Sequence, residues 1–124
     1  MALKPAARLR KNGDFHRVRQ QGRSISSRLL ILAWSPNETG QARIGFVVSK
    51  RISKLATERN HLKRLLSEAV REYIPEILPG MDIVISARNA ASAATLQTLT
   101  GDIRILLQRA KLFAATPGKL NQTT

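Results

Sequence analysis

The 124-residue sequence contains no cysteine and few acidic side chains. The lack of cysteine excludes disulfide bonds and thiolate chemistry, and it leaves structural zinc without its usual ligands. The 8 Asp and Glu residues are outnumbered by 21 Lys and Arg, so the formal net charge at pH 7 is +13. Folding does not require so large a net charge, which indicates an anionic partner, with nucleic acid the first candidate.

Long apolar runs are missing as well. No stretch comes near the length of about 18 apolar residues that spans a membrane, and the start of the chain lacks the apolar region of a signal peptide. Attachment to an anionic membrane surface is disfavoured, because the basic residues are spread through several predicted elements instead of one amphipathic helix. We therefore expect a cytoplasmic protein.

The positive charge is concentrated in one part of the chain. Residues 1–71 hold 16 basic and 4 acidic side chains, a net charge of +12, whereas residues 72–124 hold 5 and 4, a net charge of +1. An apolar content of 43%, arranged in periodic segments, favours a folded domain over a disordered basic tail. The length suits one domain, and we expect it to span residues 1–124, with an ordered core at 9–113 and flexible tails.

Hydrophobic periodicity and turn residues divide the chain into six predicted elements. Three have the 3.6-residue period of helices, and three have the dense or alternating apolar residues typical of strands. Residues 36–40 are rich in turn formers, so the strands on either side of them should pair as a hairpin. The predicted helices are 12–22, 57–74 and 93–113, and the predicted strands are 28–35, 43–49 and 81–87.

The ends of the first two helices have recognisable signals. Asn12 and Thr57 are expected N-caps, and Gly22 is expected to end the first helix. Two long helices with one-sided apolar stripes can cover only one face of a sheet, so the other face should be partly open. For the strand, helix and strand order that begins at residue 43, a right-handed crossover is the usual arrangement.

Helix 57–74 has the clearest pattern. Its first two turns carry one acidic residue, Glu58, against Arg59, Lys63 and Arg64. Because a helix N-terminus favours negative side chains, local stability does not explain this arrangement. A bound phosphate does, through the orphan backbone donors and the guanidinium groups; a solvated charged face is the alternative. The apolar stripe on the other side consists of Leu62, Leu65, Leu66, Ala69, Val70 and Tyr73.

Phe15, in the first helix, is one of few aromatic residues in the chain. Single-stranded nucleic acids are bound by aromatic platforms in positive grooves, so Phe15 is a candidate for base stacking. The alternative is that Phe15 only fills the core, where Trp34 is also expected. If the other strand residues face the helices, the open sheet face is lined by Leu29, Ile31, Ala33, Gly45, Val47 and Ser49.

No catalytic constellation is present in the sequence. His16 and His61 lie in basic surroundings without a nucleophile pattern, and there are no paired carboxylates and no metal-ligand spacing. Asp14, Asp82 and Asp102 are isolated along the chain, and each is expected to be a turn or cap residue. We predict no catalytic residue, and the sequence places no metal ligand.

Several segments resemble the bacterial ribonuclease P protein family. The signature-like segment is ATERNHLKRLLSEAVR at 56–71, preceded by GFVVSKR at 45–51, and the likeness extends to KNGDF at 11–15 and DIVISAR at 82–88. It covers residues 9–113. His61 and Ser67 stand where the family commonly has arginine, Ser53 where it often has glycine, and Arg19 where an aromatic residue is frequent.

The resemblance implies a fold and a division of labour. The fold would be α+β, a single RNA-binding domain with a four-stranded mixed sheet, two long helices on one face, a short N-terminal helix and a left-handed βαβ crossover. The partners would be the catalytic RNA subunit and precursor tRNA, with no membrane and no protein partner required. Catalysis would belong to the RNA, mainly with its Mg²⁺, and no organic cofactor is implied.

The resemblance also implies two sets of binding residues. The helix that carries the signature would dock on the RNA subunit, while a cleft between the first helix and the open sheet face would hold the 5′ leader of precursor tRNA. Combined with the charge pattern, the RNA-subunit set is Lys50, Arg51, Lys54, Arg59, Asn60, His61, Lys63, Arg64 and Arg71. The leader set is Phe15, Val18, Arg19, Leu29, Ile31, Ala33, Val47 and Ser49.

Two other functional classes share parts of this pattern. A ribosomal or general RNA-binding structural protein would have the same charge and much of the same layout. A stand-alone nuclease would cleave RNA without an RNA partner, which the absence of catalytic patterns in the sequence disfavours.

Overall fold

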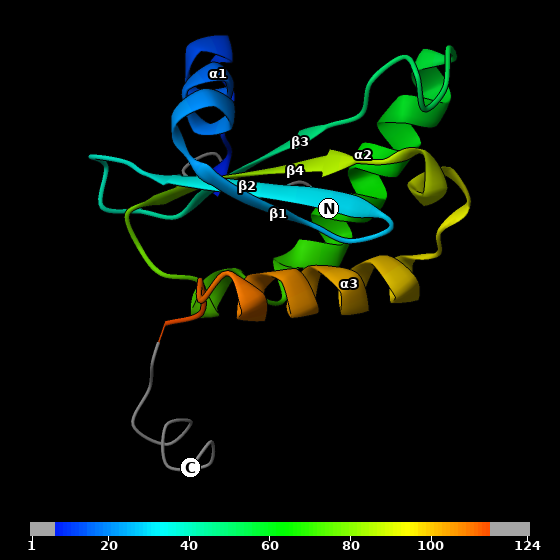
Figure 1. The fold of residues 1–124 in the computed structure, drawn as a ribbon. Helices are drawn as coiled ribbons and strands as arrows, with labels where there is room; N and C mark the ends of the chain where they lie inside the picture. The colour runs from blue at the N-terminus through cyan, green and yellow to red at the C-terminus, as the bar shows by residue number, and fades with distance from the viewer. Residues whose placement is uncertain (1–6, 115–124) are drawn as a thin grey trace.

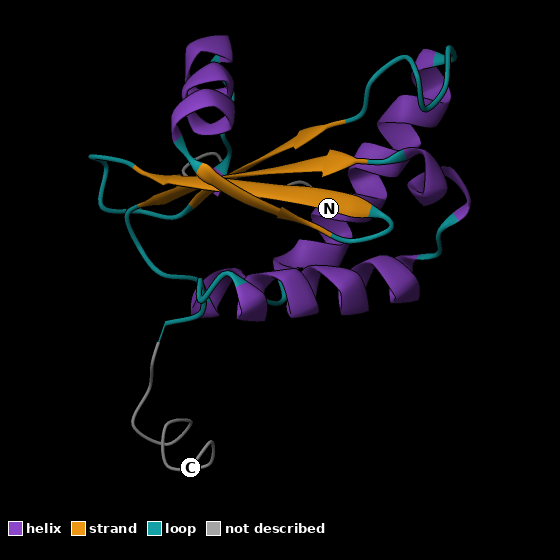
Figure 2. Ribbon diagram, in the orientation of Figure 1, coloured by secondary structure: helices purple, strands orange, loops and turns teal. Residues whose placement is uncertain are grey.

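The computed structural model describes residues 7–114, which form three α-helices and a four-stranded sheet (Figure 1). Of the tails that we expected to be flexible, residues 1–6 and 115–124 lie outside this range, whereas residues 7, 8 and 114 lie within it. Two short 3₁₀ turns accompany the main elements (Figure 2). The order along the chain is α1 Asn12–Gln21, β1 Arg23–Ser26, β2 Leu30–Pro36, β3 Arg43–Val47, α2 Ala56–Arg71, η2 Ile74–Glu76, β4 Met81–Ala87, η3 Asn89–Ala93 and α3 Leu96–Arg109.

The sheet has the strand order β1-β2-β4-β3 and is mixed. β1 and β2 pair antiparallel, as do β2 and β4, whereas β3 and β4 are parallel. The α+β fold with a four-stranded mixed sheet is therefore confirmed. The connection from β3 through α2 to β4 joins parallel neighbours, and its left-handed path stays a prediction.

The predicted hairpin between 28–35 and 43–49 is wrong. β4 lies between β2 and β3, and β2 forms its hairpin with β1, a strand that periodicity did not predict. β4 takes the central place because Ile83, Val84 and Ile85 are fully buried, and a strand covered on both faces belongs inside a sheet. β1 has one apolar residue, Ile25, among four, so it carries little hydrophobic signal.

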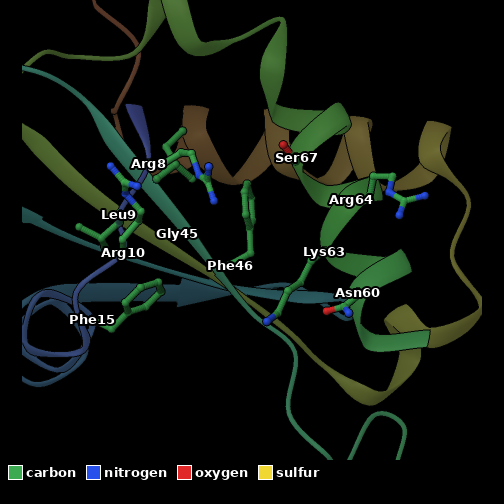
Figure 3. Close-up of a pocket in the computed structure, with 11 residues that line it drawn as sticks. Arg8, Leu9, Arg10, Phe15, Gly45, Phe46, Asn60, Lys63, Arg64 and Ser67 are labelled. Atoms are coloured by element: carbon green, nitrogen blue, oxygen red, sulfur yellow. The ribbon is translucent and has the colours of Figure 1, made fainter. Parts of the chain in front are cut away.

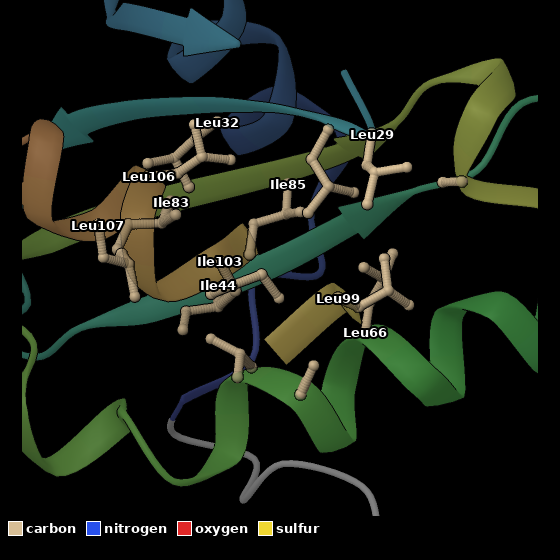
Figure 4. Close-up of a cluster of buried hydrophobic side chains, with 14 of the residues drawn as sticks. Leu29, Leu32, Ile44, Leu66, Ile83, Ile85, Leu99, Ile103, Leu106 and Leu107 are labelled. Carbon is tan, nitrogen blue, oxygen red and sulfur yellow. The ribbon is translucent and has the colours of Figure 1, made fainter. Parts of the chain in front are cut away.

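The helices lie in two layers on opposite faces of the sheet. In Figure 1, α1 lies above the sheet and α3 below it, while α2 runs from the upper right behind the strands down toward α3. The main core fills the space between the sheet and the helices α2 and α3 (Figure 4). Trp34 and Phe46 pack against this core, so the prediction of Trp34 as a core residue is confirmed. The largest completely buried members are Leu30, Leu32, Ile44, Leu66, Ile83, Ile85, Leu99, Ile103, Leu106, Leu107 and Leu112.

The residues at the N-cap positions of α1 and α2 are not the predicted ones. α1 follows Lys11 and α2 follows Leu55, and neither has a side-chain cap, so Asn12 and Thr57 are not the caps. The predicted stop is confirmed, since the Gly22 N–H donates to the Val18 carbonyl oxygen at 3.0 Å. A Cβ at Gly22 would lie 2.3 Å from the Trp34 carbonyl oxygen, so only glycine fits this close approach.

The last two helices are shorter than predicted. α2 ends at Arg71, and the 3₁₀ turn η2 contains Pro75, which cannot continue a helix. α3 begins after Thr95, whose hydroxyl accepts a hydrogen bond from the Thr98 N–H at 3.2 Å. Between residues 7 and 114, no helix combines the length and apolarity needed to cross a membrane.

Candidate nucleic-acid interface

The sheet face opposite α2 and α3 has a covered part and an open part. Strand pairing places Ala33, Val84 and Gly45 in one row across the sheet. Val18 of α1 is fully buried in the small cluster that contains Ala33 and Val84, so α1 covers this row. The neighbouring row is more open, and the side chain of its member Ile31 is 39% exposed. That row consists of Ser26, Ile31, Ser86 and Val47.

Phe15 lies at the edge of the part covered by α1. It is partly buried and packs against the cluster of Leu9, Val18, Ala33 and Val84. A Cβ at Gly45 would lie 2.3 Å from Cζ of Phe15, so the glycine lets the ring rest directly on the strand. The position of Phe15 therefore fits both base stacking and core packing, because the ring closes a small core and also leaves one surface exposed to solvent.

A basic cleft runs from α1 past the edge strand β3 to α2 (Figure 3). It has a volume of about 540 Å³. Phe15 and Gly45 line it from the side of α1, and α2 contributes Asn60, Lys63 and Arg64. The structure thus brings one predicted leader-binding residue and three predicted RNA-subunit residues to the same cavity. The lining residues are Arg8, Leu9, Arg10, Phe15, Ile44, Gly45, Phe46, Asn60, Lys63, Arg64 and Ser67.

Two cationic residues of the cleft, Arg8 and Arg10, were missed from the sequence. The segment before α1 pairs with the outer edge of β3, where the Leu9 N–H donates to the Ile44 carbonyl oxygen at 3.0 Å. The Leu9 side chain is buried, and the arginines on either side of it are exposed. This alternation of one apolar residue between two basic residues was the available signal.

The basic loop between β3 and α2 is closed by Ser53. Its hydroxyl accepts a hydrogen bond from the Leu55 N–H at 3.1 Å and donates one to the Glu58 carboxylate. Arg59 donates to the Ser53 carbonyl oxygen at 2.9 Å. The partly buried Arg59 therefore stabilises the conformation of the loop, and this role does not depend on a bound phosphate.

The remaining predicted RNA-subunit residues lie apart from the basic cleft. Lys50, Arg51 and Lys54 are exposed on the loop, and Arg71 is exposed at the end of α2. His61 lines a separate hollow of about 510 Å³ together with Ser53, Thr57, Glu58, Ile52 and Ser92.

Three of the predicted leader-binding residues are buried and cannot contact RNA. Val18 of α1 and Ala33 of β2 are buried between that helix and the sheet, and Leu29, which precedes β2, belongs to the main core on the opposite side of the sheet. The alternation rule placed Leu29 wrongly because this residue lies outside the strand, where alternation no longer holds. Arg19 is exposed and lines a hollow of about 550 Å³ with Asn12, Phe15, His16 and Gln20. Ile31, Val47 and Ser49 remain accessible at least in part.

Asp82 is not the turn or cap residue that we expected. It lies within β4, its side chain is fully buried, and it accepts hydrogen bonds from Arg17, Asn37 and Arg43. Burial alone would raise the pKa of Asp82, but hydrogen bonds from Arg43 and Asn37 and the charges of Arg43 and Arg17 outweigh it, so this pKa is below its usual value. The hydrogen bond to Asp82 raises the pKa of Arg43.

The other two isolated aspartates also have tertiary partners. Asp14 of α1 lies 3.9 Å from Arg17 and 3.7 Å from Arg43. Asp102 of α3 accepts a hydrogen bond from the Ser27 hydroxyl, which ties the turn between β1 and β2 to that helix. Residues 7–114 hold no group of three or more His, Asp or Glu side chains that could bind a metal ion.

The chain is similar in sequence to proteins of a known family. The family model described as Ribonuclease P matches residues 3–111. The ribonuclease P protein component of Roseiflexus sp. strain RS-1 is 39% identical over 115 residues, which cover 92% of this chain and 93% of that protein. The component of Chloroflexus aurantiacus is 38% identical over 122 residues, which cover 98% of this chain and 87% of that one.

Solved structures agree with the sequence matches. The RNase P protein of Staphylococcus aureus superposes with a TM-score of 0.79 at 31% identity, over 87% of this chain and 98% of that chain. The RNase P protein of Thermotoga maritima superposes with a TM-score of 0.74 at 30% identity, over 82% of this chain and 96% of that chain. In both sequence and fold, over most of its length, the chain belongs to the ribonuclease P protein family.

Proposed function

We propose that this protein binds the catalytic RNA of a ribonuclease P particle and the 5′ leader of precursor tRNA, and so assists endonucleolytic removal of the leader in the cytoplasm. The observation that carries the proposal is the basic cleft, in which the half-buried ring of Phe15 lies with Lys63 and Arg64 of α2. A single strand needs this combination, since its phosphates require cations and its bases require an apolar surface to stack on.

The leader would cross the basic cleft along the edge of β3. Lys63, Arg64, Arg8 and Arg10 line the cleft and can neutralise phosphates from both of its sides. A base can stack on the exposed surface of Phe15, which Gly45 supports from below. Stacking tolerates any base, because every base has a π face. This arrangement suits a ligand whose sequence varies from one precursor to the next.

The catalytic RNA would bind mainly outside the basic cleft. The loop residues Lys50, Arg51 and Lys54 are exposed, and Arg71 extends the positive charge to the far end of α2. In this proposal the protein supplies charge and placement, while the RNA with Mg²⁺ supplies the hydrolytic chemistry. Phosphates of the RNA, and not a side-chain cluster of this protein, would provide most Mg²⁺ ligands.

Reconstitution tests the proposal. The purified protein is combined with the ribonuclease P RNA of the same organism, and removal of the leader from a precursor tRNA is measured at low magnesium. We expect faster cleavage with the protein than without it, and no cleavage by protein from which RNA has been exhaustively removed. A protein that leaves the RNA-catalysed rate unchanged would fit a ribosomal or general RNA-binding role instead, and cleavage without RNA would indicate a nuclease.

A further inference from the structure

The apolar contact between α1 and the sheet is small. Of the ten residues of α1, only Val18 is buried, and Phe15 adds a partly buried ring. The rest of the helix is polar, with Asn12, His16, Arg19, Gln20 and Gln21 exposed. Val18 alone cannot define how α1 is rotated about its axis, because one contact point leaves the helix able to roll. The ring of Phe15 adds a second apolar contact, and a polar contact on the other side of the helix would fix the rotation that points this ring toward the basic cleft.

The Asp82 carboxylate supplies that contact. Its oxygens accept from Arg43 Nε at 2.8 Å, from Arg43 Nη2 at 2.7 Å and from Asn37 Nδ2 at 2.7 Å. Arg17 of α1 donates a further hydrogen bond to Oδ2. The side chain of Asp82 is completely buried, so the sheet offers α1 one fixed negative charge beneath the helix.

Arg17 is held at both of its terminal nitrogens. While Nη2 binds Asp82, Nη1 donates to the Ser35 hydroxyl at 3.1 Å and to the Pro36 carbonyl oxygen at 3.0 Å. These acceptors lie at the end of β2, next to Asp82 in the strand pairing. A guanidinium bound in this way has a defined direction, because its donors are fixed in one plane.

Arg17 and Phe15 lie on opposite flanks of Val18. At about 100° per residue, Phe15 is offset from Val18 by about 60° to one side of the helix and Arg17 by about 100° to the other. If α1 rolled about Val18, one flank would rise as the other fell. A clamp on Arg17 therefore determines how the Phe15 ring meets Gly45.

We infer that Asp82 is a positioning residue of the basic cleft: through Arg17 it sets the rotation of α1 and thereby holds Phe15 where a nucleotide base stacks. The inference rests on the proposed function, because it takes leader binding as the role of the positioned Phe15 ring. A buried ion pair often adds little stability compared with apolar packing of similar volume, and in some proteins its role is to specify geometry. Here it specifies the orientation of the one helix that carries the ring.

Asp82→Asn tests the inference, because it removes the charge and keeps the size of the side chain. In the free protein, we expect faster hydrogen–deuterium exchange over 12–21 and little change over 56–71. In the reconstituted holoenzyme, affinity for precursor tRNA with its leader should fall by about 5-fold to 150-fold, the range for one lost stacked base. Affinity for the same tRNA without a leader should stay close to that of the unaltered protein.

A double-mutant cycle separates positioning from general destabilisation. If Asp82 acts through Phe15, then Phe15→Ala in the Asp82→Asn background should weaken leader binding much less than it does alone. Ile103→Val removes a methylene from the core between the sheet and α3, away from α1, and is the matched control. Its effect on leader binding should be small, and it should leave the effect of Phe15→Ala unchanged.

Two results would overturn the inference: unchanged exchange over 12–21 in a folded Asp82→Asn protein, or effects of Asp82→Asn and Phe15→Ala that simply add. If Asp82→Asn does not fold, Arg17→Met releases α1 and keeps the pair of Asp82 with Arg43, and the same outcomes are expected. A Phe15→Ala protein with unaltered leader binding would contradict the proposed function. The exchange over 12–21 would still decide whether Asp82 orients α1.

Discussion

At the scale of single residues, Phe15 and Gly45 form a unit. The ring covers a strand position that has no side chain, and a Cβ there would lie 2.3 Å from Cζ and 2.5 Å from Cε1 of Phe15. The ring therefore lies directly on the sheet. One of its sides packs against the small cluster of Leu9, Val18, Ala33 and Val84, and the other lines the basic cleft. Stacking and core packing are thus two uses of the same side chain.

Phe15→Ala should weaken binding of precursor tRNA with its leader more than binding of mature tRNA. The expected loss for the leader-bearing ligand is about 1–3 kcal/mol, because one stacked base loses its platform. Equilibrium binding of the reconstituted holoenzyme to both tRNAs measures the difference. Equal losses for both ligands, or a large drop in folding stability with unchanged binding, would show that the ring serves only the core.

Gly45→Ala should reproduce part of the Phe15→Ala defect while leaving the ring in the chain. The added methyl occupies the place of the ring, so Phe15 must move away from the strand, with a stability cost of about 1–3 kcal/mol typical of overpacking. Leader affinity and urea denaturation measure the two effects. Gly40→Ala is an unsuitable comparison, since Gly40 has a positive φ of 76°. Gly13 has open space at its Cβ position and serves as the control.

At the scale of elements, α2 separates its structural face from its binding face. Leu62, Leu66 and Val70 are buried against the main core, whereas Asn60, Lys63 and Arg64 face the basic cleft. The absence of a side-chain cap at its start leaves backbone donors there. This end of the helix combines those donors with cationic side chains, as phosphate binding requires.

Arg64→Ala should preserve folding, because the exposed side chain leaves no cavity. It should weaken binding of precursor tRNA, because Arg64 lines the basic cleft in which we place the leader. Each lost phosphate contact should flatten the slope of log affinity against log salt concentration by about 0.7–0.9 unit. Asn60→Ala removes no charge and should weaken binding with little change in slope. Titrations at several salt concentrations measure both slopes.

Arg59→Ala is expected to be less specific than Arg64→Ala. Its side chain donates to the Ser53 carbonyl oxygen, so the substitution also loosens the loop before α2. If a folded Arg64→Ala protein left its RNA complex inactive at saturating protein and high magnesium, the residue would have a catalytic role and our assignment of RNA binding would be wrong.

At the scale of the whole molecule, one partly buried charge network, centred on the buried Asp82 carboxylate, joins α1 to three strands of the sheet. Arg17 comes from α1, Arg43 from β3 and Asp82 from β4, while Ser35 extends the contacts to β2. A protein with a net charge of +13 carries considerable self-repulsion. The buried carboxylate places a negative charge where two arginines would otherwise repel each other.

Asp82 should make folding stability depend on acidic pH. Because its pKa is lower in the folded protein than in the unfolded chain, its contribution is present above the unfolded value of about 3.9. It is lost as the pH falls through the folded value. Urea denaturation of the unaltered protein between pH 2 and pH 6, in comparison with Asp82→Asn, measures this term. The variant should lose less stability on acidification, and an identical pH dependence would contradict the role of the carboxylate.

The sequence by itself determined those features that depend on neighbouring residues. The period of α2 and its cationic N-terminal turns, the apolar run of β4 and the stop at Gly22 were all predicted and are all present. The resemblance to the ribonuclease P protein also lay in local segments and is confirmed. Helix periodicity and end signals are carried by contacts over a few residues, so one chain segment is enough to recognise them.

Only the tertiary structure decided which segments meet. The place of β4 between β2 and β3 depends on burial of both of its faces, and no single segment encodes that choice. Asp82 finds its partners 65, 45 and 39 residues away in Arg17, Asn37 and Arg43. Arg8 and Arg10 reach the basic cleft because the segment before α1 pairs with β3. These features form only when distant parts of the chain pack together and bury apolar surface. The periodicity of a single segment does not show which other segment it will pack against.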